Sequence, residues 1–189
     1  LPGFGNDQVD YVTPNGLTEE VGLAAALERR GVSSISVVPI RRADWLNVAR
    51  GLTDLSFVAG NAQPEGPAFS WYVTAAKATV ERAVAARRTS IDAAADARVV
   101  LIGHSAGGWL ARALCAVAGD EWVEKNIRGI VTLGAPHASP PPGTADQTRG
   151  TIPAVNHRVP GAVRAARART RLHANPCLRL TSFLPFAAR

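Results

Sequence analysis

One short stretch constrains the fold of this chain more than any other. Residues 99–102 are four consecutive apolar residues, and Gly103-His104-Ser105-Ala106-Gly107 follows them directly, at the start of a helix-like stretch over residues 106–118. A short apolar run of this kind is typical of a strand that is buried on both faces of a parallel sheet. The serine is therefore expected at the tip of a buried strand, where a sharp turn leads into a helix.

A Gly-x-Ser-x-Gly sequence at a strand-to-helix junction is typical of a nucleophile elbow. Such a turn strains the serine backbone, and a Cβ atom at either glycine would collide with the neighbouring strand or helix. The backbone N–H groups of a helix that begins at Ala106 point into the space above Ser105, where they stabilise an oxyanion. We therefore expect Ser105 to be a nucleophile. The alternative is a structural glycine-rich turn with an incidental serine.

The first five residues, "LPGFG", are a candidate for a second oxyanion donor. An apolar strand end followed by a Gly-x-Gly turn exposes backbone N–H groups, and such a donor comes from the loop after an earlier strand. Phe4 is the first candidate and Gly5 the second. An ordinary glycine-rich turn is the alternative, and a dinucleotide-binding loop is disfavoured because the third glycine is missing at Gln8.

Strand-like and helix-like patterns alternate along the first two thirds of the chain. We expect helices over residues 18–30, 68–88 and 106–118, and strands over residues 32–40, 98–102 and 127–136. This alternation predicts an α/β fold with a mainly parallel sheet of at least four strands, flanked by helices. With 47% hydrophobic and 19% charged residues, the 189-residue chain has the composition of a globular protein.

Charge divides the chain into two parts. Residues 1–157 hold 14 basic and 15 acidic residues, whereas residues 158–189 hold seven arginines and no acidic residue. We expect residues 1–157 to be one domain, incomplete at both ends, and residues 158–189 to be a disordered basic tail. Arginines interleaved with apolar residues fit an anionic membrane surface. Nucleic-acid binding is not expected, because the body is neutral and no recognised module is present.

Several segments together resemble one family of proteins. "LPGFGND", "RRADWLNVARG", "AFSWY", "VVLIGHSAGGWLAR", "VTLGAPH" and "DQTRG" are similar to the lipase-like α/β-hydrolases of plants and algae that are related to the GPI inositol-deacylase α/β domain. The resemblance covers about residues 1–160. It implies a serine hydrolase that cleaves a small-molecule or lipid ester, without a metal ion or an organic cofactor. By position, Ser105 matches the nucleophile, and the backbone N–H groups of Ala106 and Phe4 match the oxyanion donors.

The catalytic acid and base are less well defined in the sequence. In this fold they follow the serine in the order Asp or Glu, then His. Asp146 with His157 keeps that order, and so does Asp146 with His173. Asp146 could instead pair with Arg149 as a loop residue. Because few residues follow "LGAPH", the C-terminus is expected to be divergent or truncated, and an inactive hydrolase that binds a lipid or a partner is the second interpretation.

The remaining histidines and the tryptophans have more ordinary roles by this reasoning. His104 is expected to pack beside the turn, and His137 either lines the cleft or serves its loop. The four tryptophans are expected to be core residues or cleft walls, with Trp109 on the first turn of the helix and nearest the cleft. They are Trp45, Trp71, Trp109 and Trp122.

Overall fold

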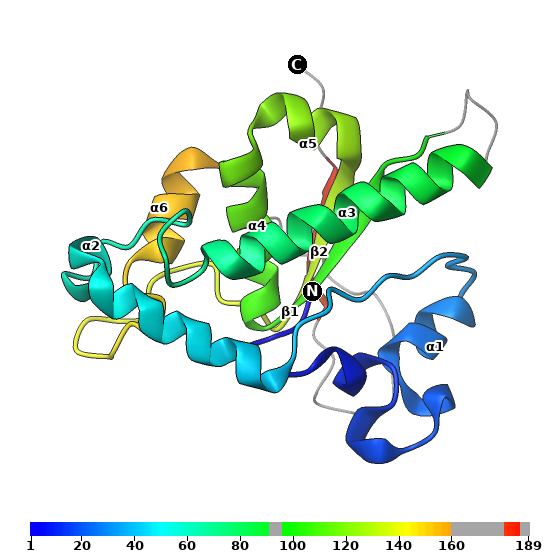
Figure 1. The fold of residues 1–189 in the computed structure, drawn as a ribbon, viewed down its shortest axis with the longest axis horizontal. Helices are drawn as coiled ribbons and strands as arrows, with labels where there is room; N and C mark the ends of the chain where they lie inside the picture. Colours follow the sequence, from blue (N-terminus) through cyan, green and yellow to red (C-terminus); the bar gives the residue numbers. More distant parts are fainter. Residues whose placement is uncertain (91–95, 160–179, 186–189) are drawn as a thin grey trace.

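The computed structural model describes residues 1–90, 96–159 and 180–185. Figure 1 shows a narrow sheet with helices packed around it and the long helix α3 running across it. In chain order the elements are η1 (Gln8–Tyr11), η2 (Pro14–Gly16), η3 (Glu19–Val21), α1 (Leu23–Glu28), η4 (Arg42–Thr53), α2 (Leu55–Val58), α3 (Ser70–Ser90), β1 (Val99–His104), α4 (Ala106–Ala118), α5 (Asp120–Asn126), β2 (Ile127–Leu133), α6 (Thr151–Arg158) and β3 (Leu180–Pro185), where η denotes a 3-10 helix.

The sheet has the order β1-β2-β3. Strands β1 and β2 are parallel, with Leu101 opposite Ile130 and His104 opposite Leu133, and helices α4 and α5 connect them. This unit confirms the predicted α/β class with parallel strands flanked by helices. The expectation of at least four parallel strands was wrong for the described ranges, where β1 and β2 are the parallel pair and β3 runs antiparallel to β2.

Strand β3 lies within the segment for which the sequence predicts a disordered tail. Residues 180–185 pair with β2, so this part of the expected tail belongs to the sheet. Residues 160–179 and 186–189 lie outside the described residues, as do His173 and six of the seven tail arginines. For those residues the expected disorder and the expected membrane contact stay predictions.

The two helices nearest the serine form where the sequence predicts them. Helix α4 begins at Ala106 and ends at Ala118, the bounds expected from the apolar pattern. Helix α3 begins and ends two residues later than the predicted helix over residues 68–88, and it buries a stripe that includes Val73, Ala76 and Val80. Helical spacing places these side chains on one face, which packs against α4.

The N-terminal helix is shorter than predicted. The sequence predicts one helix over residues 18–30, but η3 and α1 are separate and Gly22 between them is extended, with φ −68° and ψ 154°. A Cβ atom on Gly22 would lie 2.2 Å from the carbonyl oxygen of Val12. The close approach of the preceding loop therefore determines the break, and no local pattern contains that information.

The strand predicted over residues 32–40 is also absent, although Val38 and Ile40 are buried as the alternation suggests. A cavity of about 130 Å³ separates residues 32–37 from β1. Of the described residues, Leu1 forms the backbone hydrogen bonds at that edge of β1: its nitrogen donates to the Ile102 carbonyl at 2.8 Å and its carbonyl accepts the His104 N–H. A strand needs a neighbour about 4.8 Å away to complete its hydrogen bonds, and no strand among the described residues pairs with residues 32–37.

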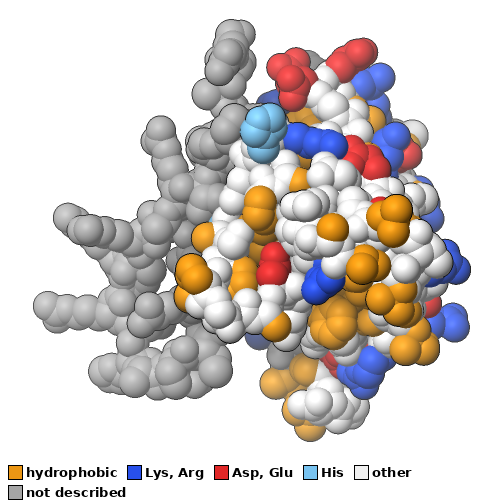
Figure 2. All heavy atoms as spheres, turned by 90° about the vertical axis from the view of Figure 1, so that its left-hand side faces the viewer, with side chains coloured by type: hydrophobic (Ala, Val, Ile, Leu, Met, Phe, Trp, Pro, Cys, Tyr) orange, Lys and Arg blue, Asp and Glu red, His pale blue; other side chains and the backbone are white. Residues whose placement is uncertain are grey.

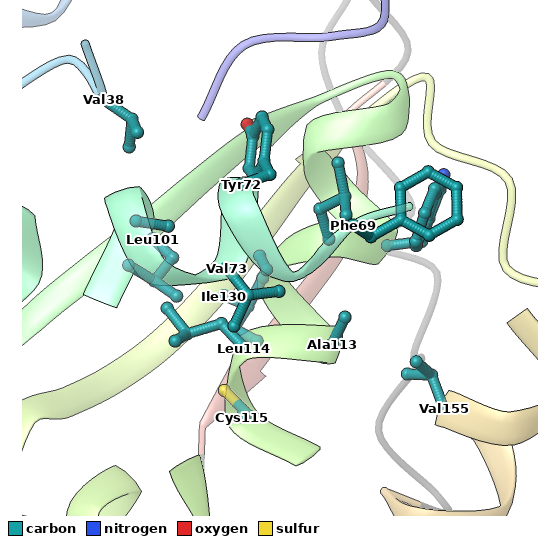
Figure 3. Packing of buried hydrophobic residues seen from close by; sticks show 14 of the residues in the cluster. Val38, Phe69, Tyr72, Val73, Leu101, Ala113, Leu114, Cys115, Ile130 and Val155 are labelled. Carbon is teal, nitrogen blue, oxygen red and sulfur yellow. The ribbon is translucent and has the colours of Figure 1, made fainter. Parts of the chain in front are cut away.

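The hydrophobic core lies between α3, α4 and the sheet. Figure 3 shows Val73 of α3, Leu114 of α4 and Ile130 of β2 gathered in one cluster, with Leu101 of β1 beside them. Full burial of a side chain of this size contributes about 1.5–3 kcal/mol. The core therefore fixes the end of β1 relative to the start of α4, which is where Ser105 lies. No helix within the described ranges has the length and apolar character needed to cross a bilayer.

Candidate active site

Ser105 occupies a strained turn between β1 and α4. Its φ of +49° and ψ of −121° lie outside the regions that a side-chain-bearing residue ordinarily adopts, which costs about 1–3 kcal/mol. Two backbone hydrogen bonds hold the turn: the Ser105 N–H donates to the Leu133 carbonyl at 2.8 Å, and the Gly108 N–H donates to the Ser105 carbonyl at 3.0 Å. Packing of both neighbouring elements maintains this strain at one half-buried serine.

The glycines on both sides of the serine are required by close contacts. A Cβ atom on Gly103 would lie 2.5 Å from the Gly107 carbonyl oxygen, and one on Gly107 would lie 2.2 Å from the Leu1 carbonyl oxygen. The sequence-based reason for these two glycines is therefore confirmed. Gly108 was not singled out from the sequence, yet a Cβ atom there would lie 2.4 Å from that of Ala135.

Ser105 opens into a cavity of about 600 Å³. Its walls come from the N-terminal loop, η4, α2, the segment before α3, the start of α4 and the loop that leads into α6. The lining is mostly apolar and aromatic, and consists of Phe4, Trp45, Val48, Phe57, Phe69, Ser105, Ala106, Trp109, Pro136, Ala138, Pro140, Ala145, Asp146, Gln147, Thr148, Arg149 and Ile152. A volume of this size is typical of a site for a small organic ligand.

The two predicted oxyanion donors line this same cavity. Among the described residues, neither the backbone N–H of Phe4 nor that of Ala106 has a hydrogen-bond partner. Phe4 and Ala106 therefore lie at the cavity wall together with Ser105, each with a backbone N–H that no other described residue satisfies.

Hydrogen bonds from distant residues fix the loop that carries Phe4. The Tyr72 hydroxyl of α3 donates to the Pro2 carbonyl at 2.8 Å, and the Tyr11 hydroxyl accepts the Gly3 N–H at 2.9 Å. The indole N–H of Trp45 donates to the Asn6 carbonyl at 3.0 Å. These side chains hold the loop from both sides, so the Phe4 N–H has a defined position next to the β1–α4 turn.

Asp146 reaches the cavity wall, but its carboxylate is engaged within its own turn. It accepts hydrogen bonds from the backbone N–H and hydroxyl of Thr148, at 2.8 and 2.7 Å, and from the Gly150 N–H at 2.9 Å. Burial raises the pKa of Asp146, but these hydrogen bonds and the charge of Arg149 outweigh burial and hold the pKa below its ordinary value. Asp146 and Arg149 form no direct ion pair within the described chain.

None of the histidines in the described ranges lines the cavity of Ser105. His157 is exposed near the end of α6. His104 turns to the other side of β1, where its Nδ1 lies 2.9 Å from the Tyr11 hydroxyl and its ring contacts the smaller cavity. His137 is held in its loop, with Nε2 3.0 Å from the Thr132 hydroxyl. The structure thus brings Asp146, but not His157, to the cavity of Ser105.

Two of the four tryptophans form walls of the cavity. Trp45 and Trp109 line it, whereas Trp71 packs edge-on against Trp45 with ring centroids 5.4 Å apart. Trp122 lies elsewhere, on α5, where its indole N–H donates to Glu81. The expectation that tryptophans serve as core residues or cleft walls therefore fits these positions, and Trp109 lies at the cleft as predicted.

Arg149 was considered only as a partner of Asp146, but it has a larger structural role. Its guanidinium donates to the Phe57 carbonyl at 3.0 Å and to the Val58 carbonyl, and lies over the Phe57 ring at 5.7 Å. Its backbone has a φ of +51°. Arg149 therefore ties the loop before α6 to α2 and closes that side of the cavity.

A buried arginine on α4 was missed by the sequence reasoning. Arg112 is 2% exposed, its Nη2 donates to the Val159 carbonyl at 3.2 Å, and its Nη1 lies 3.5 Å from Nδ1 of His137. Its Nε has no partner within the described residues. Desolvation lowers the pKa of Arg112, and burial together with the Arg112 charge lowers the pKa of His137. The sequence does contain a signal for this buried charge, because Arg112 is an arginine within the otherwise apolar helical stretch 106–118.

The described residues contain no group of three or more His, Cys, Asp or Glu side chains that could hold a metal ion. What the site offers is a strained serine, two free backbone donors and an apolar cavity. These features together define a mixed α/β fold of the α/β-hydrolase type, with a serine at the strand-to-helix turn next to an apolar cavity.

The family model of the PGAP1-like alpha/beta domain matches residues 54–170, which is more than half of the chain. The chain belongs to this family. The match includes β1, Ser105, α4 and the loop with Asp146, but begins after Phe4. No curated protein and no solved structure gave a significant match. The family assignment confirms the resemblance to the lipase-like α/β domain, a hydrolase-type family.

Proposed function

We propose that this protein is a serine ester hydrolase that acts through an acyl-enzyme on Ser105. One observation carries the proposal: Ser105 lies in a strained turn at the wall of a mostly apolar cavity, and the same cavity is lined by Phe4 and Ala106, whose backbone N–H groups have no partner in the described chain. Strained residues persist where the surrounding structure holds them for a function. Free donors next to a hydroxyl are the arrangement that acyl transfer requires.

The proposed reaction has two steps. The Ser105 Oγ forms a bond to the ester carbonyl carbon, and the negative charge that develops on the carbonyl oxygen is stabilised by the N–H groups of Ala106 and Phe4. The alcohol leaves with a proton when the tetrahedral intermediate collapses. Water then attacks the acyl-enzyme, which releases the carboxylic acid and restores the hydroxyl. This chemistry calls for neither a metal ion nor an organic cofactor.

The proton of Ser105 needs an acceptor, and we retain Asp146 and His157 as the proposed acid and base. Asp146 lines the cavity and is ionised at neutral pH, because its hydrogen bonds hold the pKa below its ordinary value. His157 follows on α6, which packs against α4. For this pair to act, α6 must bring His157 from the surface to the cavity. Variants His157→Gln and Asp146→Asn test each role separately.

The cavity favours an ester with an apolar acyl group. Trp45, Phe57, Phe69 and Trp109 supply aromatic walls, and burying apolar substrate surface contributes about 25 cal/mol per Å². A lipid ester or an apolar small-molecule ester fits this lining. A strongly charged acyl group would lose its hydration without gaining a matching partner.

Labelling with a fluorophosphonate probe tests the proposal directly, because the probe reacts rapidly only with an activated serine. We expect the 189-residue chain to be labelled and Ser105→Ala to lose labelling completely. Ser33→Ala removes an exposed serine and serves as the matched control. Labelling that persists in Ser105→Ala would contradict the assignment of the nucleophile.

A second candidate function is a lipid- or partner-binding module without turnover. It is favoured by one observation: within the described residues no histidine lines the cavity, and the Asp146 carboxylate already accepts three hydrogen bonds. A serine without a base is a weak nucleophile. A folded chain that binds an apolar ester analogue but shows no labelling would favour this candidate over hydrolysis.

A further inference from the structure

Helix η4 forms one wall of the cavity and has three distinct faces. It is a 3-10 helix of 12 residues, and such a helix has three residues per turn, so that residues three apart share a face. The inner face carries Trp45, Val48 and Gly51. Trp45 and Val48 line the cavity of Ser105, and Gly51 lies against the Phe57 ring, where a Cβ atom would come within 2.7 Å.

The second face of η4 is apolar and points to solvent. It carries Ala43, Leu46, Ala49 and Leu52; Leu55 and Val58 follow at the same sequence spacing on α2, after the extended residue Asp54. We call this set the outer stripe; its members are Ala43, Leu46, Ala49, Leu52, Leu55 and Val58, all exposed. Leu46 is 79% exposed, Leu52 70% and Leu55 86%.

Single exposed apolar residues are ordinary on protein surfaces, but a contiguous row of them indicates an interaction site. The three leucines of the outer stripe are the most exposed of the large apolar residues in the described chain. Phe4, at the rim of the same cavity, is also 60% exposed. The row therefore runs along the outside of the wall that encloses the proposed acyl site.

Next to the outer stripe, two arginines have no ion-pair partner within the described residues, whereas two carboxylates accept hydrogen bonds from their own turns. Arg41 and Arg50 are exposed and form no ion pair within the described residues. Asp44 accepts the Arg41 N–H at 2.7 Å, and Asp54 accepts the N–H and hydroxyl of Ser56 at 2.9 and 2.7 Å. Figure 2 shows the face on the side of α2 and α6, where hydrophobic side chains gather beside basic ones.

We propose that the outer stripe docks onto the surface of a lipid bilayer that contains anionic lipids. A short helix with leucines on one face and arginines beside them lies in the interfacial plane, with its apolar side chains among the acyl chains and its cations near the headgroups. A protein partner is less well matched, because Arg41 and Arg50, which form no ion pair within the described residues, favour an anionic surface beside the exposed leucines.

Docking at this surface brings η4 to the membrane. Because the inner face of the same helix lines the cavity, we expect the substrate to pass from the bilayer to Ser105 along η4. The docking itself is independent of catalysis. The statement that the bilayer supplies the ester rests on the proposed function, and the two are tested by separate measurements.

Co-sedimentation with vesicles tests the docking with the full 189-residue chain. The vesicles are phosphatidylcholine alone, or phosphatidylcholine with about one third phosphatidylserine. We expect the unchanged chain to bind the anionic vesicles. The test variant is the triple substitution Leu46→Gln, Leu52→Gln, Leu55→Gln. Each leucine removed should lower the partition coefficient at least about tenfold. Arg41→Gln with Arg50→Gln is expected to reduce the preference for anionic vesicles.

The control is a second triple variant that removes exposed apolar side chains elsewhere. Leu17→Gln, Val21→Gln and Val32→Gln change residues that are 55%, 59% and 39% exposed and lie near η3 and α1. This control is expected to bind vesicles like the unchanged chain. Equal binding by the outer-stripe variant and the unchanged chain would overturn the proposal. A change from dimer to monomer in the outer-stripe variant would also overturn it, because the stripe would then bind a second copy of the chain.

Two further measurements distinguish docking by the outer stripe from binding through the arginines of residues 158–189 and from the proposed hydrolase function. The loss caused by the leucine variant should persist at about 0.5 M salt, whereas binding through the arginines of residues 158–189 is screened there. Turnover of a water-soluble ester should be unchanged in the leucine variant and turnover of a vesicle-borne ester should fall. Absence of turnover in the unchanged chain would refute the proposed function while leaving the vesicle-binding result intact.

Discussion

The Tyr11 hydroxyl and Nδ1 of His104 lie 2.9 Å apart, and their rings meet edge to face with centroids 5.9 Å apart. The same hydroxyl accepts the Gly3 N–H at 2.9 Å, so its own hydrogen is free to point to His104. One phenol therefore links the loop that carries Phe4 to the residue that precedes Ser105. Through this link, the two proposed oxyanion donors are held in one rigid arrangement.

Replacing Tyr11 with phenylalanine should therefore affect both stability and the reactivity of Ser105. The change leaves the Gly3 N–H without its partner, which costs about 1–3 kcal/mol when the group is buried. We expect a lower free energy of unfolding in urea and slower labelling of Ser105 by a fluorophosphonate. Thr89→Ala, which removes an exposed hydroxyl on α3, is the control. Unchanged labelling in a folded Tyr11→Phe chain would contradict a positioning role.

Stability should fall as the pH is lowered from about 7.5 to 5.5. Burial lowers the pKa of His104 and, with the Arg112 charge, that of His137. The unfolded chain then binds protons at a higher pH than the folded chain, and the folded state loses free energy as the pH drops below about 6.5. Urea unfolding at several pH values measures this slope.

Variants identify the histidines responsible for that slope. His104→Asn and His137→Asn should each make the free energy of unfolding less dependent on pH over this range. Burial also lowers the pKa of the Leu1 α-amino group to about 5, so part of the slope should remain in the double variant of His104 and His137. A slope as steep in the double variant as in the unchanged chain would contradict the assignment to these histidines.

Replacing Gly103 with alanine should destabilise the chain more than replacing Gly31 with alanine. At Gly103 the new Cβ atom collides with neighbouring backbone, whereas at Gly31 it meets open space and only strains the backbone. In Gly103→Ala the new atom meets the Gly107 carbonyl and the Gly108 Cα at 2.5 Å, and backbone atoms cannot move aside like a flexible side chain. We expect a loss of about 3 kcal/mol. Gly31 has a φ of +87° and open space around it, so Gly31→Ala should cost about 1–2 kcal/mol. Chemical denaturation of both variants provides the comparison, and equal losses would refute the steric argument.

Removing the buried charge of Arg112 should raise the pKa of His137. In Arg112→Met the apolar volume is largely retained, but the cation that disfavours protonated His137 is gone. Burial still acts on the ring, so the pKa should move toward its ordinary value without reaching it. An NMR titration of the His137 ring measures the change. Lys77→Met, which removes an exposed cation paired with Glu81, should leave the His137 titration unaltered.

Much of the site could be predicted from the sequence, because the interactions that form it act between residues that are close together in the chain. The apolar run before Gly103, the small residues around Ser105 and the helical pattern from Ala106 each act over a few residues, and they predict strand, turn and helix without knowledge of the rest of the chain. The placement of Phe4 beside Ser105 also agrees with the structure. The reason given for Gly107, a neighbour too close for a Cβ atom, holds as well.

What the sequence could not supply depends on partners that are far away along the chain. Residues 32–40 alternate like a strand, but a strand needs a neighbour, and a cavity lies beside them instead. The apolar stripe of η4 is invisible at helical spacing, because a 3-10 helix repeats every three residues. The exposed position of His157 follows from how α6 packs on α4.

The sequence by itself thus determined the turn at Ser105 and the class of fold, since steric exclusion and side-chain periodicity operate between residues that are close in the chain. Tertiary structure alone decided which groups share the cavity of Ser105. It joins Asp146, Arg149 and Trp45 to that serine and leaves His157 outside, because contacts between distant segments arise only when burial of apolar surface brings α3, α4 and the sheet together.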